Sequence, residues 1–576
     1  MSGPGLTGGS VADQILAALA AQGTTCAFLV PGYLTGPYNA ALAAGRLLPV
    51  VCAHELGAGY MADGYARVSG RPGCAIGISA PGAINMLTAA ASAAADRVPV
   101  LFLSGNVASA GAVRGAFQDG GDCGTRDRHL FGELMRCARE SRQVDDVPGD
   151  LAAALAALTA TPAAPAFLSA PRDVLAAACG PEGLPAQSSL ARRENSAGSW
   201  SEPFHRLGNS ASRIALLVGE AATDPALAPL LRAAVERHAL PLATTMTAKG
   251  ILPEDHPLCL GCFGYGGSPR AHAALPGGQL DGLLVMGADF TERNTLGWHA
   301  EILRERPGFH LVSWAGAPGF AGLPQVVADF AATLRWLAEG EDAALRPLAA
   351  GAGARRAWLE DLRRVPEVAR WLPAADGLHP GEIVEIMRSV LPESTILFVD
   401  AGMGRRVVGQ YWRCQAPGRL FASPVIGPMG WGLAASIGGK LARPGLPVVA
   451  LAGDGSMLMH GMELATAVRH RVPVIWVIND NRALGTIQLR ADSPAEAALS
   501  AGMPLCWAAF ARLMGADGYV AKTASDLADA LRAALAAGGP ALIAVRGTLA
   551  FAADDPFFGG SMRSPRGPQG VDESSE

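Results

Sequence analysis

Residues 453–481 read GDGSMLMHGMELATAVRHRVPVIWVINDN, and this stretch decides the fold. It opens at the end of one apolar run, PVVALAGDG, and closes after a second, VPVIWVINDN, with the helix-like MELATAVRH between them. The pattern predicts a strand, a tight turn, a helix and a second, parallel strand. Open parallel sheets bind ligands beyond the carboxyl ends of their strands. We therefore expect Asp454 and Asn481 to lie at such an edge.

The residue types at this edge favour a metal-bound diphosphate. The Asp454 carboxylate and the Asn481 amide oxygen, 27 positions apart, are hard donors of the kind that Mg²⁺ or Ca²⁺ takes. Gly455 and Ser456 begin the predicted helix, whose free N–H groups favour a phosphate. The alternative is an ordinary βαβ unit with an Asp in its turn, which the complete segment disfavours.

The chain also repeats itself. Residues 96–103, DRVPVLFL, are similar to residues 470–477, HRVPVIWV, at a shift of 374 positions. At the same shift, CAIGISAPG (74–82) falls on VVALAGDGS (448–456). Two strands that recur with the same separation indicate a duplicated α/β domain. The first copy has Ala80-Pro81-Gly82 in place of Asp454-Gly455-Ser456, so we expect only the second copy to hold the metal.

Composition narrows the class of protein. The 576 residues predict three or four domains, with 50% apolar and 17% charged residues. A net charge of −5 gives no basic field for nucleic acid. The uncharged stretch 151–171 is broken by Pro162 and Pro165, so it predicts the end of a helix and a strand rather than a membrane span.

The termini and the cysteines indicate a cytoplasmic protein. The first residues, MSGPGLTGGS, lack the basic and then apolar stretch of a secretory signal. Ten cysteines are scattered, and only Cys259 and Cys262 form a CxxC, with no second pair to complete a zinc site. We expect most of them to be buried thiols in a reducing compartment.

Alternating strand-like and helical runs predict an α/β fold with three doubly wound parallel-sheet domains. The predicted domains are 1–185, 206–345 and 379–552, followed by a polar tail, 553–576. Residues 181–205, rich in Gly, Pro and Ser, are expected to form a linker, and residues 346–378 a second connector.

The segment 453–481 resembles the cofactor signature of thiamine diphosphate-dependent enzymes, with Asp480 in place of the first of two paired Asn residues. Nearly the whole chain is similar to the acetolactate synthase-like branch of that family. The order there is a pyrimidine-binding domain, a middle domain and a diphosphate-binding domain. Matching stretches are HELGAGYMADGYAR (54–67), PGAIN (81–85), AFQD (116–119), PRDV (171–174), PEDHPL (253–258) and GPMGWGLAASIG (427–438).

The resemblance assigns roles to individual residues. It implies that Asp454, Asn481 and the main-chain carbonyl of Ala483 hold Mg²⁺. It makes Glu55 the carboxyl that exchanges a proton with the aminopyrimidine ring, and Met429 the apolar wedge that bends the cofactor. Gln118 and Arg490 are further candidate catalytic residues. The other candidate cofactor contacts are Gly402, Met403, Gly427, Gly453, Gly455, Ser456, Leu484 and Gly485.

The resemblance also implies an oligomer. In the family, the glutamate of one chain serves the cofactor held by the metal-binding residues of another. We therefore expect a homodimer or homotetramer with active sites at the chain interface.

Four positions depart from the synthase pattern. Gly402-Met403-Gly404 replaces Gly-Gln-His, so main-chain N–H groups, Arg405 or Arg406 would have to contact the diphosphate. Asn106 replaces a Gln and Ala80 a Gly, and Arg490 stands where the synthase has a Trp. An Arg offers a forked cation for an anionic substrate or acceptor, unless it is a surface residue of a shifted loop. FAD, which the synthase subgroup carries, is left open, because GCFGYGG (261–267) fits either a flavin site or a turn.

The predicted function is decarboxylation of a 2-oxo acid with transfer of the acyl-anion equivalent to a carbonyl acceptor, by a carboligase other than the housekeeping branched-chain enzyme. A simple decarboxylase, or a C–C lyase or acyl transferase on the same scaffold, is the alternative. A homologue that binds the cofactor without turnover is a third interpretation, and Glu55 argues against it. A nicotinamide-dependent dehydrogenase is excluded, because no GxGxxG follows an early strand.

Overall fold

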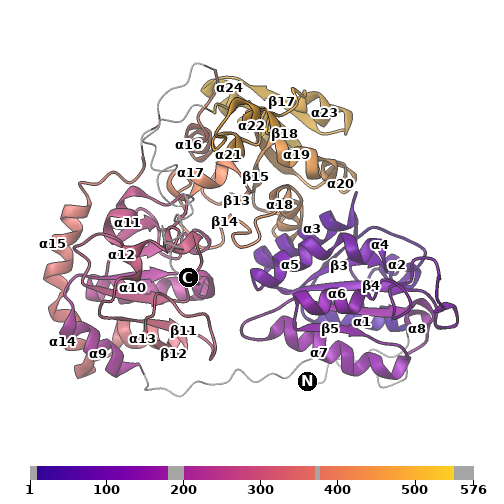
Figure 1. The fold of residues 1–576 in the computed structure, drawn as a ribbon, viewed down its shortest axis with the longest axis horizontal. Helices are drawn as coiled ribbons and strands as arrows, with labels where there is room; N and C mark the ends of the chain where they lie inside the picture. The colour runs from indigo at the N-terminus through magenta and orange to yellow at the C-terminus, as the bar shows by residue number, and fades with distance from the viewer. Residues whose placement is uncertain (1–8, 180–199, 370, 372–375, 550–576) are drawn as a thin grey trace, which may run out of the picture. The chain divides into compact units, whose positions relative to one another are not determined.

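In a computed structural model, the chain is described at residues 9–179, 200–369, 371 and 376–549. These residues form three sheets of six strands each, all with parallel pairing, flanked by helices (Figure 1). The predicted α/β class with three doubly wound sheets is confirmed. The inner strands are short apolar runs buried on both faces, as is usual in parallel sheets, whereas edge strands such as those at 137–140 and 517–521 are partly exposed.

The first sheet has the strand order β2-β1-β3-β4-β6-β5. Its strands are β1 (Cys26–Leu29), β2 (Leu48–Val51), β3 (Gly73–Ile78), β4 (Val100–Asn106), β5 (Cys137–Glu140) and β6 (Ala166–Pro171). Its helices are α1 (Val11–Ala21), α2 (Gly36–Ala43), α3 (Glu55–Ser69), α4 (Pro81–Asn85), α5 (Leu87–Ala95), α6 (Asp127–Leu134), α7 (Val147–Thr159) and α8 (Arg172–Ala176).

The middle sheet has the order β12-β11-β10-β7-β8-β9. Its strands are β7 (Ile214–Val218), β8 (Leu242–Thr244), β9 (Cys259–Cys262), β10 (Gly282–Met286), β11 (Gly308–Val312) and β12 (Gln325–Val327). Its helices are α9 (Ser201–Ser210), α10 (Ala228–His238), α11 (Pro269–Ala274), α12 (Ala300–Leu303), α13 (Phe330–Glu339), α14 (Arg346–Ala350) and α15 (Ala352–Leu362).

The last sheet has the order β14-β13-β15-β16-β18-β17. Its strands are β13 (Ile396–Val399), β14 (Leu420–Phe421), β15 (Val448–Gly453), β16 (Val474–Asp480), β17 (Asp517–Ala521) and β18 (Ala541–Arg546). The helices in this part of the chain are α16 (Pro380–Val390), α17 (Met403–Tyr411), α18 (Trp431–Ala442), α19 (Asp454–His460), α20 (Leu464–Arg469), α21 (Gly485–Gln488), α22 (Pro494–Leu499), α23 (Trp507–Leu513) and α24 (Ala524–Ala537).

The duplication predicted from the sequence is confirmed by strand order. The first and last sheets have the same topology when β1–β6 are matched to β13–β18 in chain order. Strand β4 falls on β16 at the shift of 374 positions that the sequence repeat gives. Even the turns agree, since Arg97 (φ 56°) and Arg471 (φ 51°) both adopt a left-handed conformation one residue after the matched positions Asp96 and His470.

The chain divides into two compact units. One contains residues 1–193, 390–402 and 421–546, and therefore both copies of the repeat, whereas the other contains the middle sheet with residues 403–420. Within the first unit, one core cluster includes apolar side chains of both sheets together with those of α3 and α18. The middle sheet has a core of its own.

Helices α3 and α18 join the two copies through direct main-chain contact (Figure 1). A methyl group on Gly64 would collide with the carbonyl oxygen of Ala435, and one on Gly438 would collide with that of Met61. The repeat relates the two contacts, because Met61 and Gly64 fall on Ala435 and Gly438 at the same shift. The helices therefore pack about an approximate two-fold axis.

A buried polar group fixes the register of this helix pair. The Asp63 carboxylate accepts a hydrogen bond from the Trp431 indole N–H (2.9 Å) and pairs with Arg67 (2.6 Å). Arg67 also pairs with Asp96 (2.7 Å) and lies over the Trp431 ring. The charges are paired, which lowers the cost of burying them.

Helices occupy parts of the two predicted connecting segments. Helix α9 begins at Ser201, inside the linker predicted over 181–205, and α14 and α15 occupy part of the connector predicted over 346–378. The strand at 137–140 was not predicted, because CARE is too short and polar to stand out. The domain boundaries stay predictions, and the tail 553–576 lies outside the described residues.

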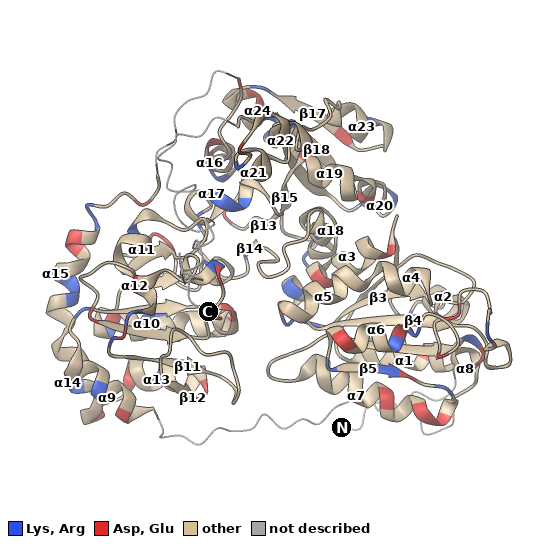
Figure 2. Ribbon diagram, viewed as in Figure 1, with Lys and Arg blue, Asp and Glu red and all other residues tan. Residues whose placement is uncertain are grey.

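Other expectations from composition agree with the structure. Seven of the ten cysteines are buried. Along α15 a pair of basic side chains is followed by a pair of acidic ones, so this helix carries no single-sign stripe (Figure 2). In the described parts of the chain, every helix is too short or too polar to cross a membrane.

Replacing Gly64 with Ala should destabilise the first unit strongly. The methyl group meets main chain rather than a movable side chain, so we expect a loss of roughly 3 kcal/mol or more and a lower melting temperature by calorimetry. The control is Gly353→Ala on α15, where a methyl group meets nothing and better helix propensity adds up to ~1 kcal/mol. Equal melting of the Gly64→Ala protein and the unaltered protein would contradict the close contact.

Candidate active site

The carboxyl ends of β15 and β16 bring the predicted metal ligands together. Asp454 is the first residue of α19, directly after β15, and is 3% exposed. Asn481 follows β16, and its side-chain oxygen accepts the Ala483 N–H (3.1 Å). The Ala483 N–H also contributes a hydrogen bond to the Asp454 carboxylate. Asp454, Asn481 and Ala483 therefore form one cluster at the end of adjacent parallel strands.

The electrostatics of this cluster favour a bound cation. Burial, and then the nearby Asp480 carboxylate, raise the pKa of Asp454 to about 6. Burial also raises the pKa of Asp480, while the charges of Arg482 and Arg546 oppose that rise. Asp480 stands opposite Arg546 in the β16–β18 register, a pairing that the sequence did not reveal. A metal ion would offset the repulsion between the two carboxylates.

The donor set suits a hard metal rather than zinc. In the described residues, no group of three or more His, Cys, Asp or Glu side chains could hold a metal. The Asp454 cluster instead offers a carboxylate, an amide oxygen and main-chain groups, which is the chemistry of Mg²⁺ sites that keep waters and phosphate oxygens as further ligands.

A narrow cradle adjoins the cluster. A methyl group on Gly455 would lie 2.6 Å from Leu484 Cδ2 and 2.9 Å from Met429 Cε, so the ends of both side chains pack directly against the Gly455 main chain. The Ser456 hydroxyl is fully buried and has no hydrogen-bond partner in the described protein. Buried hydroxyls normally have partners. These residues fit a ligand that presents both an apolar surface and an oxyanion.

Some of the other candidate contacts lie next to Met429 and Leu484 in the chain, and others lie elsewhere. Gly427 adopts φ 64° just before Met429, and Gly485 begins α21 after Leu484. Arg490 is exposed shortly after α21. Gly402 (φ 122°) lies in the loop after β13. Met403 is the first residue of α17 and belongs to the other compact unit.

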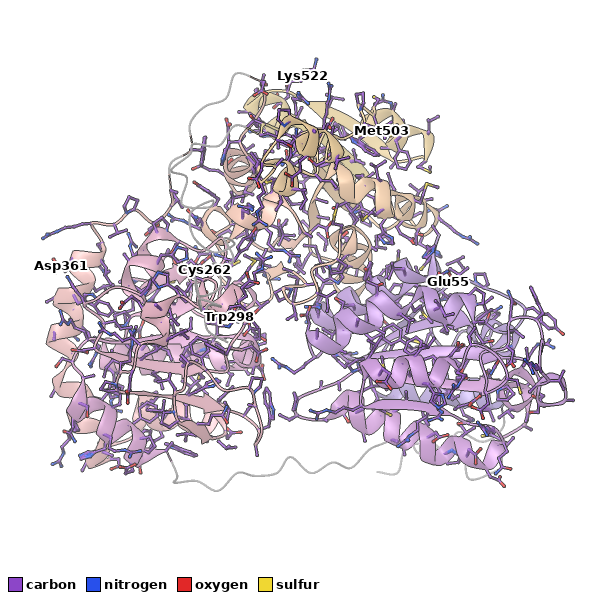
Figure 3. All side chains as sticks on the ribbon, viewed as in Figure 1. Glu55, Cys262, Trp298, Asp361, Met503 and Lys522 are labelled. Atoms are coloured by element: carbon purple, nitrogen blue, oxygen red, sulfur yellow. The ribbon has the colours of Figure 1, made fainter. Side chains whose placement is uncertain are left out.

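Glu55 lies in the first copy of the repeat, at the first position of α3 (Figure 3). It is half-buried, and its carboxylate accepts a hydrogen bond from Asn85 Nδ2 (2.9 Å). The preceding His54 caps the helix, its Nδ1 accepting the Leu56 N–H (3.0 Å). Asn85 was missed as a site residue, although it ends the matched stretch PGAIN.

Gln118 lies in a loop anchored to the first sheet. It adopts a left-handed conformation (φ 60°), and its carbonyl accepts the Ser79 hydroxyl (2.6 Å). Asn106, one of the departures from the synthase pattern, accepts the Gly120 N–H (3.0 Å). Ala80, another departure, has φ 57°, a conformation that glycine adopts more readily.

The topological switch point of the middle sheet lies between the paired strands β7 and β10, where dinucleotides bind in doubly wound sheets. Gly219 after β7 packs on Ala288 after β10 so closely that a methyl group would collide. Glu220 is half-buried there and accepts hydrogen bonds from the Asp289 N–H (3.1 Å) and from Asn294 Nδ2 (2.9 Å). Burial, and then Asp289, raise the pKa of Glu220. The loops after β7 and β10 therefore approach each other closely at this switch point and place two acidic residues there.

Comparison with known proteins identifies the fold family. Models of the N-terminal, central and C-terminal domains of thiamine pyrophosphate enzymes match residues 9–123, 206–317 and 400–545. The chain belongs to the thiamine diphosphate-dependent enzyme family. Within that family it lies in the acetolactate synthase-like branch, as the sequence resemblance predicted.

Relatives of this thiamine diphosphate enzyme are named as acetolactate synthases. A putative acetolactate synthase large subunit of Mycobacterium tuberculosis is 31% identical over 86% of the chain and 89% of that protein. A probable large subunit of Methanocaldococcus jannaschii is 30% identical over 83% and 81%. The isozyme 1 large subunit of Escherichia coli is 28% identical over 83% and 82%. The chain is therefore a thiamine diphosphate-dependent enzyme of the carboligase family.

Replacing Asp454 with Asn should stabilise the metal-free protein. Because the folded pKa of about 6 exceeds the ordinary 3.8, the metal-free fold loses stability as pH rises from 3.8 to 6. At pH 7 this loss amounts to ~3 kcal/mol, which the neutral amide avoids. We expect the Asp454→Asn protein to melt at a higher temperature than the unaltered protein at pH 7 and at the same temperature near pH 4. Mg²⁺ with thiamine diphosphate should not raise the melting temperature of the variant further.

The matched control is Asp529→Asn on α24, an exposed carboxylate that should leave the pH dependence unchanged. A gain from Asp454→Asn that is equal at pH 4 and pH 7 would show that charge burial is not its cause.

Proposed function

We propose that this enzyme decarboxylates a 2-oxo acid and transfers the remaining acyl-anion equivalent to a carbonyl acceptor. The observation that carries the proposal is the cluster of Asp454, Asn481 and Ser456 beside the Met429–Gly455 cradle. When bound, thiamine diphosphate supplies the carbon nucleophile that adds to the 2-oxo acid and accepts the electron pair left by CO₂. The relatives named as acetolactate synthases favour a carbonyl acceptor over simple protonation.

The diphosphate end of the cofactor would be held by the last sheet. Asp454, Asn481 and the Ala483 carbonyl would bind Mg²⁺, and the buried Ser456 hydroxyl would donate to a phosphate oxygen. The side chains of Leu484 and Met429, which pack against Gly455, would flank the ligand.

The ring end would be held by Met429 and Glu55. The Met429 side chain would support the bent cofactor, with main-chain groups of Gly427 against the pyrimidine. Glu55 would exchange a proton with the pyrimidine nitrogen at its carboxylate, and Asn85 fixes that carboxylate in place (2.9 Å). Gln118 would face the acceptor from its anchored loop.

Arg490 would select an anionic substrate or acceptor. It is exposed where the resembling synthases carry a Trp, and its guanidinium can bind a carboxylate, sulfonate or phosphate in a bidentate manner. This departure argues against the housekeeping branched-chain role. Arg490→Ala should raise KM for an anionic acceptor and leave KM for a neutral aldehyde unchanged. An unchanged KM for every substrate would remove Arg490 from the site.

The reaction would not use a flavin. At the switch point of the middle sheet, Gly219 packs tightly against Ala288, and Glu220 accepts a hydrogen bond from the Asp289 N–H. No step of the proposed reaction transfers electrons to or from a redox cofactor. Purified active protein should lack the visible absorbance of flavin, and stoichiometric bound FAD would contradict this part of the proposal.

The active unit would be a homodimer. Leu458, Met459 and Met462 are each more than half exposed on α19 and the turn after it, next to the metal cluster. Contiguous exposed apolar side chains indicate an interaction surface. A second copy of the chain would cover them and bring its Glu55 to this cofactor, as in the resembling enzymes.

Replacing Glu55 with Gln should abolish CO₂ release from 2-oxo acids. The amide cannot take up and return the proton, and loss of such a group costs ~10²–10⁴-fold in rate. CO₂ should be measured with Mg²⁺ and thiamine diphosphate, with and without aldehydes or a second 2-oxo acid, and the products identified.

The outcomes separate the alternatives. Faster CO₂ release and a coupled product with an acceptor support a carboligase, whereas free aldehyde alone points to a simple decarboxylase. No CO₂ release from any acid by the unaltered protein, with tight cofactor binding, would contradict the proposal and point to a lyase, an acyl transferase or a silent homologue.

Co-expression of Glu55→Gln and Asp454→Asn chains should restore activity that neither variant has alone. A hybrid dimer has one site built from the intact Glu55 of one chain and the intact Asp454 of the other. Co-expressing the unaltered chain with a chain carrying both changes is the control for chain exchange. If hybrid dimers isolated through two affinity tags show no activity, Glu55 and Asp454 of one active site belong to the same chain.

A further inference from the structure

The turn that leads into Glu55 is bound by side chains of the diphosphate segment. The N–H groups of Ala53 and His54 donate to Glu463 Oε2 (3.1 Å) and Oε1 (3.0 Å). The Val51 N–H donates to His470 Nε2 (2.9 Å). Three main-chain donors in the four residues before Glu55 thus bond to residues that follow Asp454 in the metal-binding segment.

Glu463 is built into this contact. It is 1% exposed, at the end of the turn that connects α19 to α20, and Thr466 Oγ1 donates a further hydrogen bond to Oε2 (2.6 Å). A side chain on Gly57 would overlap Glu463 Oε1, so the first turn of α3 approaches the carboxylate closely. Burial raises the pKa of Glu463, which the three hydrogen bonds to the carboxylate oppose.

The chemistry of the contact requires a carboxylate. Two consecutive N–H groups need two acceptor atoms on one side chain, and an ionised carboxylate alone provides two that are both acceptors. A glutamine would place an NH₂ donor against one N–H group. Burying a carboxylate is costly, so an interface that only packed two domains together would be expected to use apolar side chains.

We propose that Glu463 is the positioning residue for Glu55. It holds the β2–α3 turn by two consecutive amides, so that α3 begins at a fixed point and presents the Glu55 carboxylate at a fixed angle. Glu463 does not touch the reacting atoms and acts through the turn. The role of Glu55 in proton exchange is that of the proposed function, on which this inference rests.

The decisive variant is Glu463→Gln, which keeps shape and size but loses one acceptor. In the protein without cofactor, amide hydrogen exchange measured by mass spectrometry should show lost protection at 51–54. With thiamine diphosphate and Mg²⁺ bound, exchange of the cofactor's C2 hydrogen with deuterium should fall ~100-fold, the cost of a small misplacement of a reacting group. The affinity for thiamine diphosphate should stay near that of the unaltered protein, because Asp454 and Asn481 are unchanged.

Two further variants test whether the effects of Glu463→Gln arise from its contact with the β2–α3 turn. Glu385→Gln on α16, an exposed carboxylate, should change none of these measurements. Thr466→Val removes one donor to Glu463 and a second acceptor of the Ala53 N–H (3.2 Å), while Glu463 still accepts both amides, so it should give a smaller loss of amide protection and of C2 exchange. It serves as the test if Glu463→Gln does not fold.

The failures of the two proposals are distinguishable. If the unaltered protein exchanges no C2 hydrogen, or Glu55→Gln exchanges it normally, the proposed function fails. If those two behave as expected and Glu463→Gln keeps either its amide protection at 51–54 or its C2 exchange rate, the positioning role of Glu463 is overturned. A parallel loss of cofactor affinity and exchange rate would likewise overturn it, because it would mark a general structural defect.

Discussion

The main-chain contact between α3 and α18 is the constraint on which the rest of the first unit depends. Gly64 and Gly438 let two helices touch without side chains between them, and the repeat makes the contact reciprocal. The shared core and the Asp63–Arg67–Trp431 group exist only at this helix separation. The start of each helix is thereby fixed as well, and Glu55 and Met429 occupy the matching positions of the repeat.

The two copies of the repeat share one strand order but carry different residues at matching positions. Where the last sheet has Asp454 after β15, the first has Ala80 after β3, whose N–H is bound instead by Asp127 (2.9 Å). One copy therefore carries the buried Asp454 carboxylate, whose raised pKa indicates that a cation would stabilise its charge, and the other carries Glu55 after a turn held by Glu463. A buried charge is unfavourable for folding, and such unfavourable features are tolerated at functional sites.

Much of this could be predicted from the sequence, for identifiable reasons. Strands such as 214–218 and 474–480 are uninterrupted apolar runs between turns, so periodicity locates them. The cluster of Asp454 and Asn481 follows from the rule that parallel strands place their carboxyl ends together. Glu55 and Met429 came instead from resemblance, since neither residue has a distinguishing environment in the sequence. Short polar strands such as 137–140 lack an apolar run by which they could be located in the sequence.

What could not be predicted depends on contacts between residues far apart in the chain. The pairing of Asp480 with Arg546, the hold of Glu463 on residues 53 and 54, and the tight packing of Gly219 against Ala288 each need the folded positions of two segments. In the sequence, Glu463 is one acidic residue in an amphipathic helix. Only its burial and its two amide partners distinguish it.

The contact between α3 and α18 also has a consequence for biosynthesis. Its two glycines are separated by the whole middle sheet, so α3 leaves the ribosome roughly 20 to 70 s before α18 at ordinary rates of translation. During that interval the glycine face of α3 and its share of the common core are exposed to water. Contacts of such long sequence separation form slowly, and exposed apolar surface is prone to aggregation. The nascent N-terminal domain is therefore a natural client for chaperones until the last sheet is complete.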